Sequence, residues 1–208
     1  MNITDISARD GRSLTWAEKL SQIFARQTEL MEKYRHIEQL PEAPLPLHHH
    51  LSQRILKDFA WRITEELTES YEAWQKHTND PTTAELHALE ELADAFHFLV
   101  ELLIFAGISV EQCLAAKLIF PRVSRPRPSS DSYWYVVYEL GLAMNFLRNK
   151  PWKQSQVPTD EARFRTALLT TYTTMLEVWA DLGYTEEHLY VFYFRKAEVN
   201  AFRQRSNY

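Results

Sequence analysis

The fold of this chain is decided by two neighbouring stretches, WRITEELTESYEAW (61–74) and ELHALEELADAFHFLVE (85–101). In both, apolar residues recur at the three- and four-residue spacing of a helix, so the pattern predicts two helices joined by a short polar break. The second stretch is apolar almost all round from Leu92 to Ile104, and a helix of that kind is buried. We therefore expect a helical bundle built around these two helices.

Four carboxylates lie on the two helices at matching spacing. Glu66 and Glu69 are three residues apart in the first, and Glu91 and Asp94 are three apart in the second. Side chains three apart are neighbours on a helix, with Cβ atoms about 5–6 Å from each other, so antiparallel packing would bring the acids together. They could not all stay ionised without a cation, and Mg²⁺ prefers oxygen ligands. The spacing predicts metal-assisted phosphate chemistry; the alternative is a solvated acidic face.

Short motifs in the middle and at the C-terminal end of the chain resemble one family. EELTE (65–69) followed by ELAD (91–94) resembles the E-E-x-x-E and E-x-x-D signature of the all-α nucleoside triphosphate pyrophosphatases, the MazG-like superfamily. DAFHF (94–98) and YFRKAEVNAFRQRSNY (193–208) are similar to motifs of dimeric dUTPases and phage dCTPase-dUTPases. The resemblance implies an all-α bundle of about six to seven helices with a four-helix catalytic core, a homodimer, and hydrolysis of a deoxynucleoside triphosphate.

The resemblance also assigns roles to the acids. It implies that Glu66, Glu69, Glu91 and Asp94 hold two or three Mg²⁺ ions, with Mn²⁺ as an alternative. Glu66 and Glu69 would be the catalytic residues: a water molecule is the nucleophile, and Glu69 orients and deprotonates it. The cations would neutralise charge that develops on the α- and β-phosphate oxygens. The products would be the nucleoside monophosphate and pyrophosphate.

The last predicted helix carries a row of hydrogen-bond donors. Lys196, Asn200 and Arg203 follow one another at steps of four and three, so they share one helix face. Lysine supplies a point charge and arginine a fork that fits phosphate oxygens, and the resemblance adds Tyr208 as a further phosphate-binding residue. Basic residues are also common near the C-terminal end of any helix. We expect this face to hold the distal phosphates.

Four residues are candidates for the base pocket. Gln27 matches a glutamine that dimeric dUTPases use to bind the pyrimidine, and His97 and Phe98 lie in the D-x-x-H-F motif. Trp74 is the fourth; it is alternatively a core residue, as Gln27 is alternatively a surface glutamine and His97 a core histidine. Met31 stands where these enzymes have an asparagine, which leaves purine deoxynucleotides open as substrates beside dUTP and dCTP.

Composition and charge narrow the class of protein. The chain has 208 residues, is 45% hydrophobic, and contains four glycines and one cysteine, Cys113, which we expect to be packed in the core. Its net charge of −5 argues against a nucleic-acid partner, and no uninterrupted apolar stretch reaches the ~20 residues of a membrane span. We therefore expect a cytoplasmic protein, in the host cytoplasm if phage-encoded, whose partner is a small-molecule nucleotide and not a membrane.

The chain reads as one all-α domain, residues 1–208, in three parts. Metal-binding core helices occupy residues 14–120, a loop and accessory helices occupy 121–182, and the phosphate-binding helix occupies 183–208. Helical periodicity covers residues 16–38, 51–77, 84–106, 110–120, 133–149, 160–182 and 186 onward. The proline-rich residues 121–132 read as a loop. The expected N-caps include Ser13 or Thr15 for the first helix, and Ser109, Thr159 and Thr185 for later ones.

The predicted function is a metal-dependent nucleoside triphosphate pyrophosphohydrolase, a dNTP diphosphatase of nucleotide metabolism, with dUTP or dCTP favoured. Two alternatives stay open. One is the same chemistry on a purine deoxynucleotide, dATP or dGTP. The other is a non-catalytic helical dimer that acts as a binding or regulatory module, in which the acids are merely structural.

Overall fold

A computed structural model describes residues 14–76, 81–119, 129–148, 150 and 157–205 of the chain. Within these residues it has seven α-helices and no strand, which confirms the predicted all-α class. The helices are α1 (Trp16–Glu38), α2 (His50–Gln75), α3 (Pro81–Phe105), α4 (Val110–Ile119), α5 (Ser129–Phe146), α6 (Glu161–Asp181) and α7 (Glu186–Arg205).

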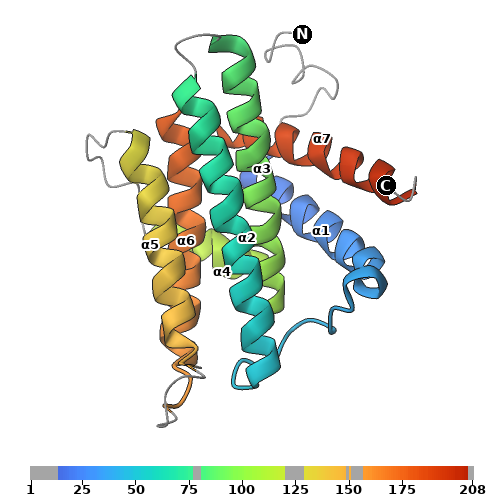
Figure 1. Ribbon diagram of the computed structural model, residues 1–208, viewed down its shortest axis with the longest axis vertical. Helices are drawn as coiled ribbons and strands as arrows, with labels where there is room; N and C mark the ends of the chain where they lie inside the picture. Colours follow the sequence, from blue (N-terminus) through green and yellow to red (C-terminus); the bar gives the residue numbers. More distant parts are fainter. Residues whose placement is uncertain (1–13, 77–80, 120–128, 149, 151–156, 206–208) are drawn as a thin grey trace.

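The central pair of the bundle is α2 and α3, which run antiparallel (Figure 1). Two sets of contacts fix their register. The hydroxyl of Ser70 donates to the carbonyl oxygen of Ala88 at 2.7 Å, and the ring of Phe59 lies 6.1 Å from that of Phe98 and 5.2 Å from that of Phe105. The N-terminal part of each helix therefore packs against the C-terminal part of the other. The central segments of the two helices, which carry the acids, lie side by side.

A second pair, α5 and α6, lies beside the first (Figure 1). Tyr133 of α5 joins the two pairs, because its hydroxyl is 2.9 Å from the Ser70 hydroxyl and its ring is 5.4 Å from the ring of Tyr71. On α6, the side chains of Tyr172 and Trp179 are almost completely buried. The two helices thus complete the bundle, while the division of the chain into three parts stays a prediction.

The helices α1 and α7 pack on α3 and extend away from the long axis of the bundle (Figure 1). The predicted cap of α1 is confirmed: the Thr15 hydroxyl accepts from the N–H of Glu18 at 3.3 Å, and the Glu18 carboxylate accepts from the N–H of Thr15 at 2.8 Å. Ser109 and Gln112 make the same reciprocal pair before α4, at 3.3 and 2.9 Å. Such pairs satisfy N–H groups that have no partner inside the helix.

No single described helix is both long and apolar enough to cross a membrane; α3 and α4 pass by length and composition only as a pair, from Thr83 to Lys117, that is bent by 115°.

The predicted N-cap of α6 is wrong by one residue. Asp160 caps the helix, since its carboxylate accepts from the N–H of Arg163 at 3.1 Å. The hydroxyl of Thr159 instead donates to the carbonyl oxygen of Leu147 at 2.9 Å and accepts from the amide of Gln53 at 2.8 Å. Both residue types cap helices, and the negative charge of aspartate is additionally favoured at a helix start, so contacts with other elements decide between them.

Two helices begin earlier than predicted. The helix α5 starts at Ser129 instead of Tyr133, and α3 starts at Pro81 instead of after Thr82 or Thr83. Proline is well suited to the first turn of a helix, because the backbone N–H that it lacks would have no acceptor within the helix there. Serine and aspartate are also favoured at helix starts. The predicted loop 121–132 is therefore wrong for residues 129–132, and its remainder lies outside the described residues.

Candidate active site

Three acids converge where the middle of α2 faces the middle of α3. Carboxylate oxygens of Glu66, Glu91 and Asp94 lie within 4.8 Å of one another, and all three side chains are half-buried. Glu66 comes from α2 and the other two come from α3. The antiparallel register places them level, and the three-residue step between Glu91 and Asp94 keeps both on the face that meets α2.

The electrostatics of the cluster are dominated by crowding of negative charge. Burial, then the charge of Asp94, then the hydrogen bond and charge of Glu91, and finally the charge of Glu69, raise the pKa of Glu66 to about 8. At neutral pH the cluster therefore favours a bound proton or another positive charge in this place. On the solvent side, the imidazole of His87 lies 3.0 Å from Glu91.

The cation nearest to the acids comes from the far end of the chain. The Lys196 ammonium on α7 lies 2.6 Å from Oδ2 of Asp94, and both side chains are less than one-fifth exposed. Burial alone would lower the pKa of Lys196, but the hydrogen bond and charge of Asp94, with the charges of Glu91 and Glu90, raise it. Lys196 is therefore a permanent positive charge at the edge of the acid cluster.

The remaining acids and donors predicted for this site are placed less closely. Glu69 is exposed and outside the group of three. Its charge still contributes to the raised pKa of Glu66. Asn200 is half-buried on α7. The side chain of Arg203 and the whole of Tyr208 lie outside the described residues.

A buried polar network lies one helical turn beyond Asp94. Nδ1 of His97 is 2.9 Å from Oε1 of Gln27, and Nε2 of His97 is 3.0 Å from the carbonyl oxygen of Tyr193. The hydroxyl of Tyr193 donates to the same oxygen of Gln27, and its ring stacks on His97 with 3.8 Å between centroids. These contacts join α1, α3 and α7 at one point.

The protonation state of this network follows from its burial. Burial lowers the pKa of His97 to about 3, against the hydrogen bond to Tyr193 and with help from the charge of Lys196. The imidazole is therefore neutral, and its single N–H donates to one of the two facing oxygens. Gln27 and His97 lie inside the protein, at 4% and 5% exposure, so the surface alternative for Gln27 is wrong and the role of both in base binding stays a prediction.

Sequence reasoning missed the charged residues on the other side of Gln27. Glu101 is 7% exposed; burial and the charge of Glu38 raise its pKa to about 8, opposed by Arg62 and by a hydrogen bond with Gln27. The guanidinium of Arg62 bonds Glu38 at 2.8 Å and lies 5.6 Å from the centroid of the Phe98 ring. The signal in the sequence was a single acid inside an apolar helix, since such residues are rarely buried without partners.

The two aromatic candidates for the base pocket lie on opposite sides of the acids. Phe98 is one turn past Asp94 on α3 and is half-buried. Trp74 is half-buried against the core and lies eight residues past Glu66, about 12 Å along α2 in the other direction. Met31, the residue that departs from the family pattern, is buried in the hydrophobic core. One base therefore cannot contact Phe98 and Trp74 of the same chain together.

The acid cluster fits a hard divalent cation. Three carboxylates from two rigid helices present oxygen atoms within 4.8 Å of one another, which is the donor type that Mg²⁺ and Mn²⁺ prefer. The raised pKa of Glu66 also favours a cation site, because a group of acids that binds a proton near neutral pH can bind a cation in the same place.

The fold and this cluster define an all-α protein with an acid site suited to divalent cations. A dUTPase family model matches residues 19–208, and the chain therefore belongs to the dUTPase family. Searches of curated proteins and of solved structures return no significant match. The protein is accordingly a dNTP diphosphatase, a hydrolase of nucleotide metabolism whose partner is a small nucleotide, at family level dUTP. The predicted relationship to the dUTPases is confirmed. The alternative of a non-catalytic helical dimer is rejected.

Proposed function

We propose that this dUTPase-family protein uses Mg²⁺ to cleave dUTP, dCTP or both between the α- and β-phosphates, releasing the monophosphate and pyrophosphate. The observation that carries the proposal is the meeting of three acids, Glu66, Glu91 and Asp94, with Lys196 at their edge. Membership of the dUTPase family supports dUTP, and the resemblance of the C-terminal motif to phage dCTPase-dUTPases supports dCTP.

The proposed metal ligands are Glu66, Glu91 and Asp94, with Glu69 as a further ligand, for two or three Mg²⁺ ions or for Mn²⁺. When bound, such cations neutralise charge on phosphate oxygens and make water more acidic. The half-burial of the three clustered acids supports this assignment, because it strengthens their attraction for a cation relative to a fully hydrated surface.

The chain's own residues then have two tasks. Lys196 donates to oxygens of the distal phosphates, and Asn200, Arg203 and Tyr208 extend this donor face along the end of the chain. Glu69 orients a water molecule and accepts its proton as the water oxygen bonds to the α-phosphorus and the bond to the pyrophosphate oxygen breaks. The exposed position of Glu69 beside the acid cluster supports this role, since a base must reach both solvent and substrate.

For the base we propose a pocket on the Phe98 side of the acids. Gln27 and His97 form its rear wall, where the Tyr193 contact fixes the orientation of the Gln27 amide. Phe98 supplies an aromatic edge, and Trp74 is assigned to the core because it lies beyond the opposite end of the acid cluster.

A substrate panel tests the proposal directly. Purified protein would be given dUTP, dCTP, dTTP, dATP, dGTP and UTP in Mg²⁺, Mn²⁺ or EDTA, with products separated by ion-exchange chromatography. We expect hydrolysis of dUTP or dCTP to the monophosphate, none in EDTA, and incorporation of labelled water oxygen into the monophosphate. Preference for dATP or dGTP would favour the purine alternative, and label in pyrophosphate would place the attack at the wrong phosphorus.

A matched pair of variants tests the acids. Glu91→Gln removes a proposed ligand, whereas Glu90→Gln changes an exposed acid at the adjacent position of α3. We expect the first to lose activity by on the order of 100-fold or more, as for removal of other charge-stabilising groups in active sites, and the second to stay within a few-fold of wild type. Equal activity of the two variants would exclude Glu91 from the mechanism.

We further propose that the protein is a homodimer, as the family resemblance implies. The apolar side chains Val199 and Phe202 on α7 are 44% and 64% exposed, which supports burial of this helix against another surface. Light scattering after size-exclusion chromatography measures the mass; a monomer at micromolar concentration would refute the proposal.

A further inference from the structure

A buried hydrogen-bond chain, from Tyr193 through His97 to Gln27, has one proton too few for the way its atoms face one another. Nδ1 of His97 is 2.9 Å from Oε1 of Gln27, and Nε2 is 3.0 Å from the carbonyl oxygen of Tyr193. Burial keeps the imidazole neutral by lowering its pKa to about 3, and a neutral imidazole has one N–H. One ring nitrogen therefore points a lone pair at an oxygen, which buried groups seldom do.

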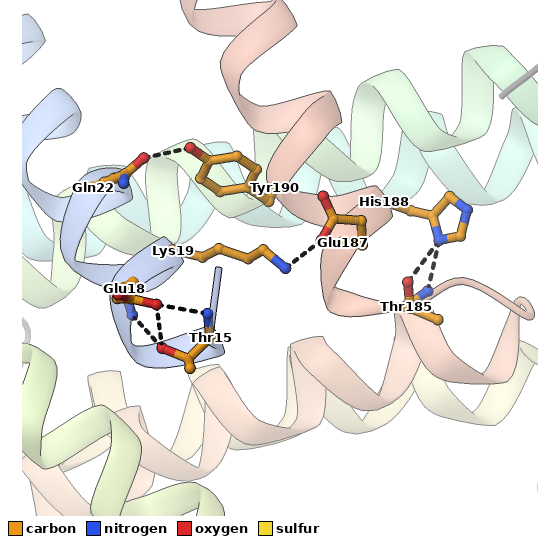
Figure 2. A network of polar contacts seen from close by, with 8 residues as sticks. All are labelled: Thr15, Glu18, Lys19, Gln22, Thr185, Glu187, His188 and Tyr190. Atoms are coloured by element: carbon orange, nitrogen blue, oxygen red, sulfur yellow. Dashed lines mark hydrogen bonds and ion pairs between the residues drawn. The ribbon is translucent and has the colours of Figure 1, made fainter. Parts of the chain in front are cut away.

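The proton of His97 lies on Nε2, because the oxygen that faces Nε2 has no other way to bond. A backbone carbonyl only accepts hydrogen bonds, and this part of α7 is held against α1 one turn earlier. There the hydroxyl of Tyr190 donates to Gln22 (Figure 2). The carbonyl of Tyr193 is thus fixed in place as an acceptor. Nδ1 of His97 is left without a hydrogen and needs a donor from Gln27.

The amide of Gln27 supplies that donor when its two ends are exchanged. A half-turn about the last side-chain bond exchanges Nε2 with Oε1 and moves no other heavy atom, so Nε2 donates to Nδ1 of His97. The second N–H of the amide donates to the hydroxyl of Tyr193, which donates in turn to the carbonyl oxygen of Ile23, 3.4 Å away. A hydroxyl accepts as well as donates, so Tyr193 holds the plane of the amide in either orientation.

The other end of the amide faces Glu101. This residue follows His97 by one turn of α3, and Gln27 hydrogen-bonds to both. When Oε1 of Gln27 points at Glu101, the carboxyl group must supply the hydrogen, so it must be protonated. Its burial fits this state, since Glu101 is 7% exposed. Burial and the charge of Glu38 raise its pKa to about 8, although the charge of Arg62 and the hydrogen bond to the amide lower it.

The charges that act on Glu101 come from α1 and α2. Glu38 of α1 lies 2.8 Å from the guanidinium of Arg62, and Asp58 of α2 lies 3.0 Å from the same group. The guanidinium of Arg62 is also 5.6 Å from the centroid of the Phe98 ring. The surroundings of the buried acid are therefore continuous with the aromatic edge that we propose for the base.

The other members of the chain keep their charge near neutral pH. Burial and the charge of Glu101 raise the pKa of Tyr193 well above its usual value, against the charge of Arg26. His97 stays neutral because burial, with the charges of Lys196 and Arg26, lowers its pKa. Glu101 is therefore the member of this chain whose charge changes near pH 8.

We propose that Glu101 is a positioning residue for base recognition: its carboxylic O–H donates to Oε1 of Gln27, which turns the amide nitrogen toward His97 and leaves a lone pair of Oε1 for an N–H group of the pyrimidine. Such a group is N3–H in uracil and the 4-amino group in cytosine. Phe98 precedes Glu101 by three residues and shares its face of α3, so the aromatic edge and the acid lie on the same side. This role rests on the base pocket proposed above.

Loss of the proton reverses the chain. Ionised Glu101 accepts from Nε2 of Gln27, and Oε1 turns back to His97. The amide then offers the base an N–H in place of a lone pair, and two N–H groups cannot bond each other. The apparent affinity for the pyrimidine therefore falls with the protonated fraction of Glu101, about tenfold at one pH unit above its pKa.

The first test follows His97 by ¹⁵N NMR in protein without nucleotide or metal, with its signals assigned from the His97→Gln variant. We expect the proton on Nε2 at pH 6 and a shift of the Nδ1 signal as the pH passes about 8, where Nδ1 loses its donor. In Glu101→Gln, whose amide N–H replaces the carboxylic O–H at every pH, the Nδ1 signal should stay constant. Glu90→Gln changes an exposed acid of the same helix and should behave as wild type.

The second test measures KM and kcat for dUTP in Mg²⁺ from pH 6 to pH 9. Uracil and Glu66 also lose protons in this range, but wild type and Glu101→Gln share both, so the ratio of their KM values isolates position 101. We expect the KM of wild type, relative to that of Glu101→Gln, to rise about tenfold by pH 9. The ratio of their kcat values should stay constant.

These tests fail independently of the proposed function. A protein that hydrolyses no pyrimidine deoxynucleotide would refute the proposed function, while NMR of the nucleotide-free protein still decides where the protons lie. The role of Glu101 is overturned if His97 carries its proton on Nδ1 at pH 6, if the wild-type Nδ1 signal does not change near pH 8, or if the KM ratio stays flat in an active enzyme. Circular dichroism checks that Glu101→Gln is folded, and the NMR of wild type alone decides if it is not.

Discussion

Replacing Glu66 with glutamine should separate the stability of this protein from its activity. The glutamine keeps the size of the side chain but removes its charge from a cluster in which burial and the charges of Asp94 and Glu91 oppose ionisation. We therefore expect the variant to be inactive and yet more stable than wild type when no metal is present. An acid that served only to hold the fold together would give the opposite change in stability.

The magnitude follows from the pKa of Glu66, which is raised from 4.5 to about 8. Because the folded protein binds this proton more tightly than the unfolded chain, the contribution of Glu66 to the free energy of unfolding is fully present below pH 4.5 and is lost as the pH rises to about 8. At about 1.36 kcal/mol for each tenfold change in proton affinity, the full effect is ~5 kcal/mol. The side chain is only half-buried, so solvent screening reduces the expected gain to about 1–2 kcal/mol above pH 8.

The assay is thermal unfolding in EDTA at pH 6 and pH 9, followed by circular dichroism. At pH 9 the variant should melt roughly 2–8 °C above wild type, and at pH 6 the difference should be smaller. Glu72→Gln, an exposed acid on the same helix, is the control and should change little. Mg²⁺ should then stabilise wild type far more than Glu66→Gln, since ligands stabilise the state that binds them. A variant that melts below wild type at pH 9 would refute the reasoning.

Three further predictions concern residues outside the acid cluster. Glu101→Gln should raise stability at pH 8 and flatten its fall between pH 5 and 8, because burial raises the pKa of Glu101 to about 8; urea midpoints that keep the wild-type slope would contradict this. Thr15→Ala removes the cap of α1 and should cost about 1 kcal/mol of unfolding free energy, whereas Thr15→Ser should cost little. Cys113 is buried, with its pKa raised to about 12 by burial, so it should react with a thiol reagent only after unfolding; fast reaction of the folded protein would show that α4 opens.

The helices were predictable from the sequence because their signals are local. The bounds of α1 match the periodic stretch 16–38, and the Thr15 cap lies directly before it. The level placement of Glu66, Glu91 and Asp94 was also expected, since it needs only a short connection and antiparallel packing. Where propensities are nearly equal, as for Thr159 and Asp160, distant partners such as Gln53 decide the outcome, and a local pattern cannot identify them.

The contacts between distant segments were not predictable. The network of Gln27, His97 and Tyr193 joins residues separated by up to 166 positions. The motifs single out Gln27 and His97 as candidates for the base pocket, but nothing in the sequence around these residues shows which residues of distant helices they contact. Glu69 illustrates the same limit on a smaller scale, because spacing gives its helix face but not the angle at which α3 meets that face.

The ion pair between Lys196 and Asp94 makes the proposed active site depend on the packing of the last helix against the bundle. Segments of a protein open with different free energies. In the described part of α7, whose outer half exposes Val199 and Phe202, fewer side chains are buried than in α2 and α3. Mild denaturant that lifts this helix would leave the rest of the molecule intact but deprive the acids of their lysine. If the proposed roles of Lys196 and Asp94 are right, we expect activity to be lost at a lower denaturant concentration than the one that unfolds the core.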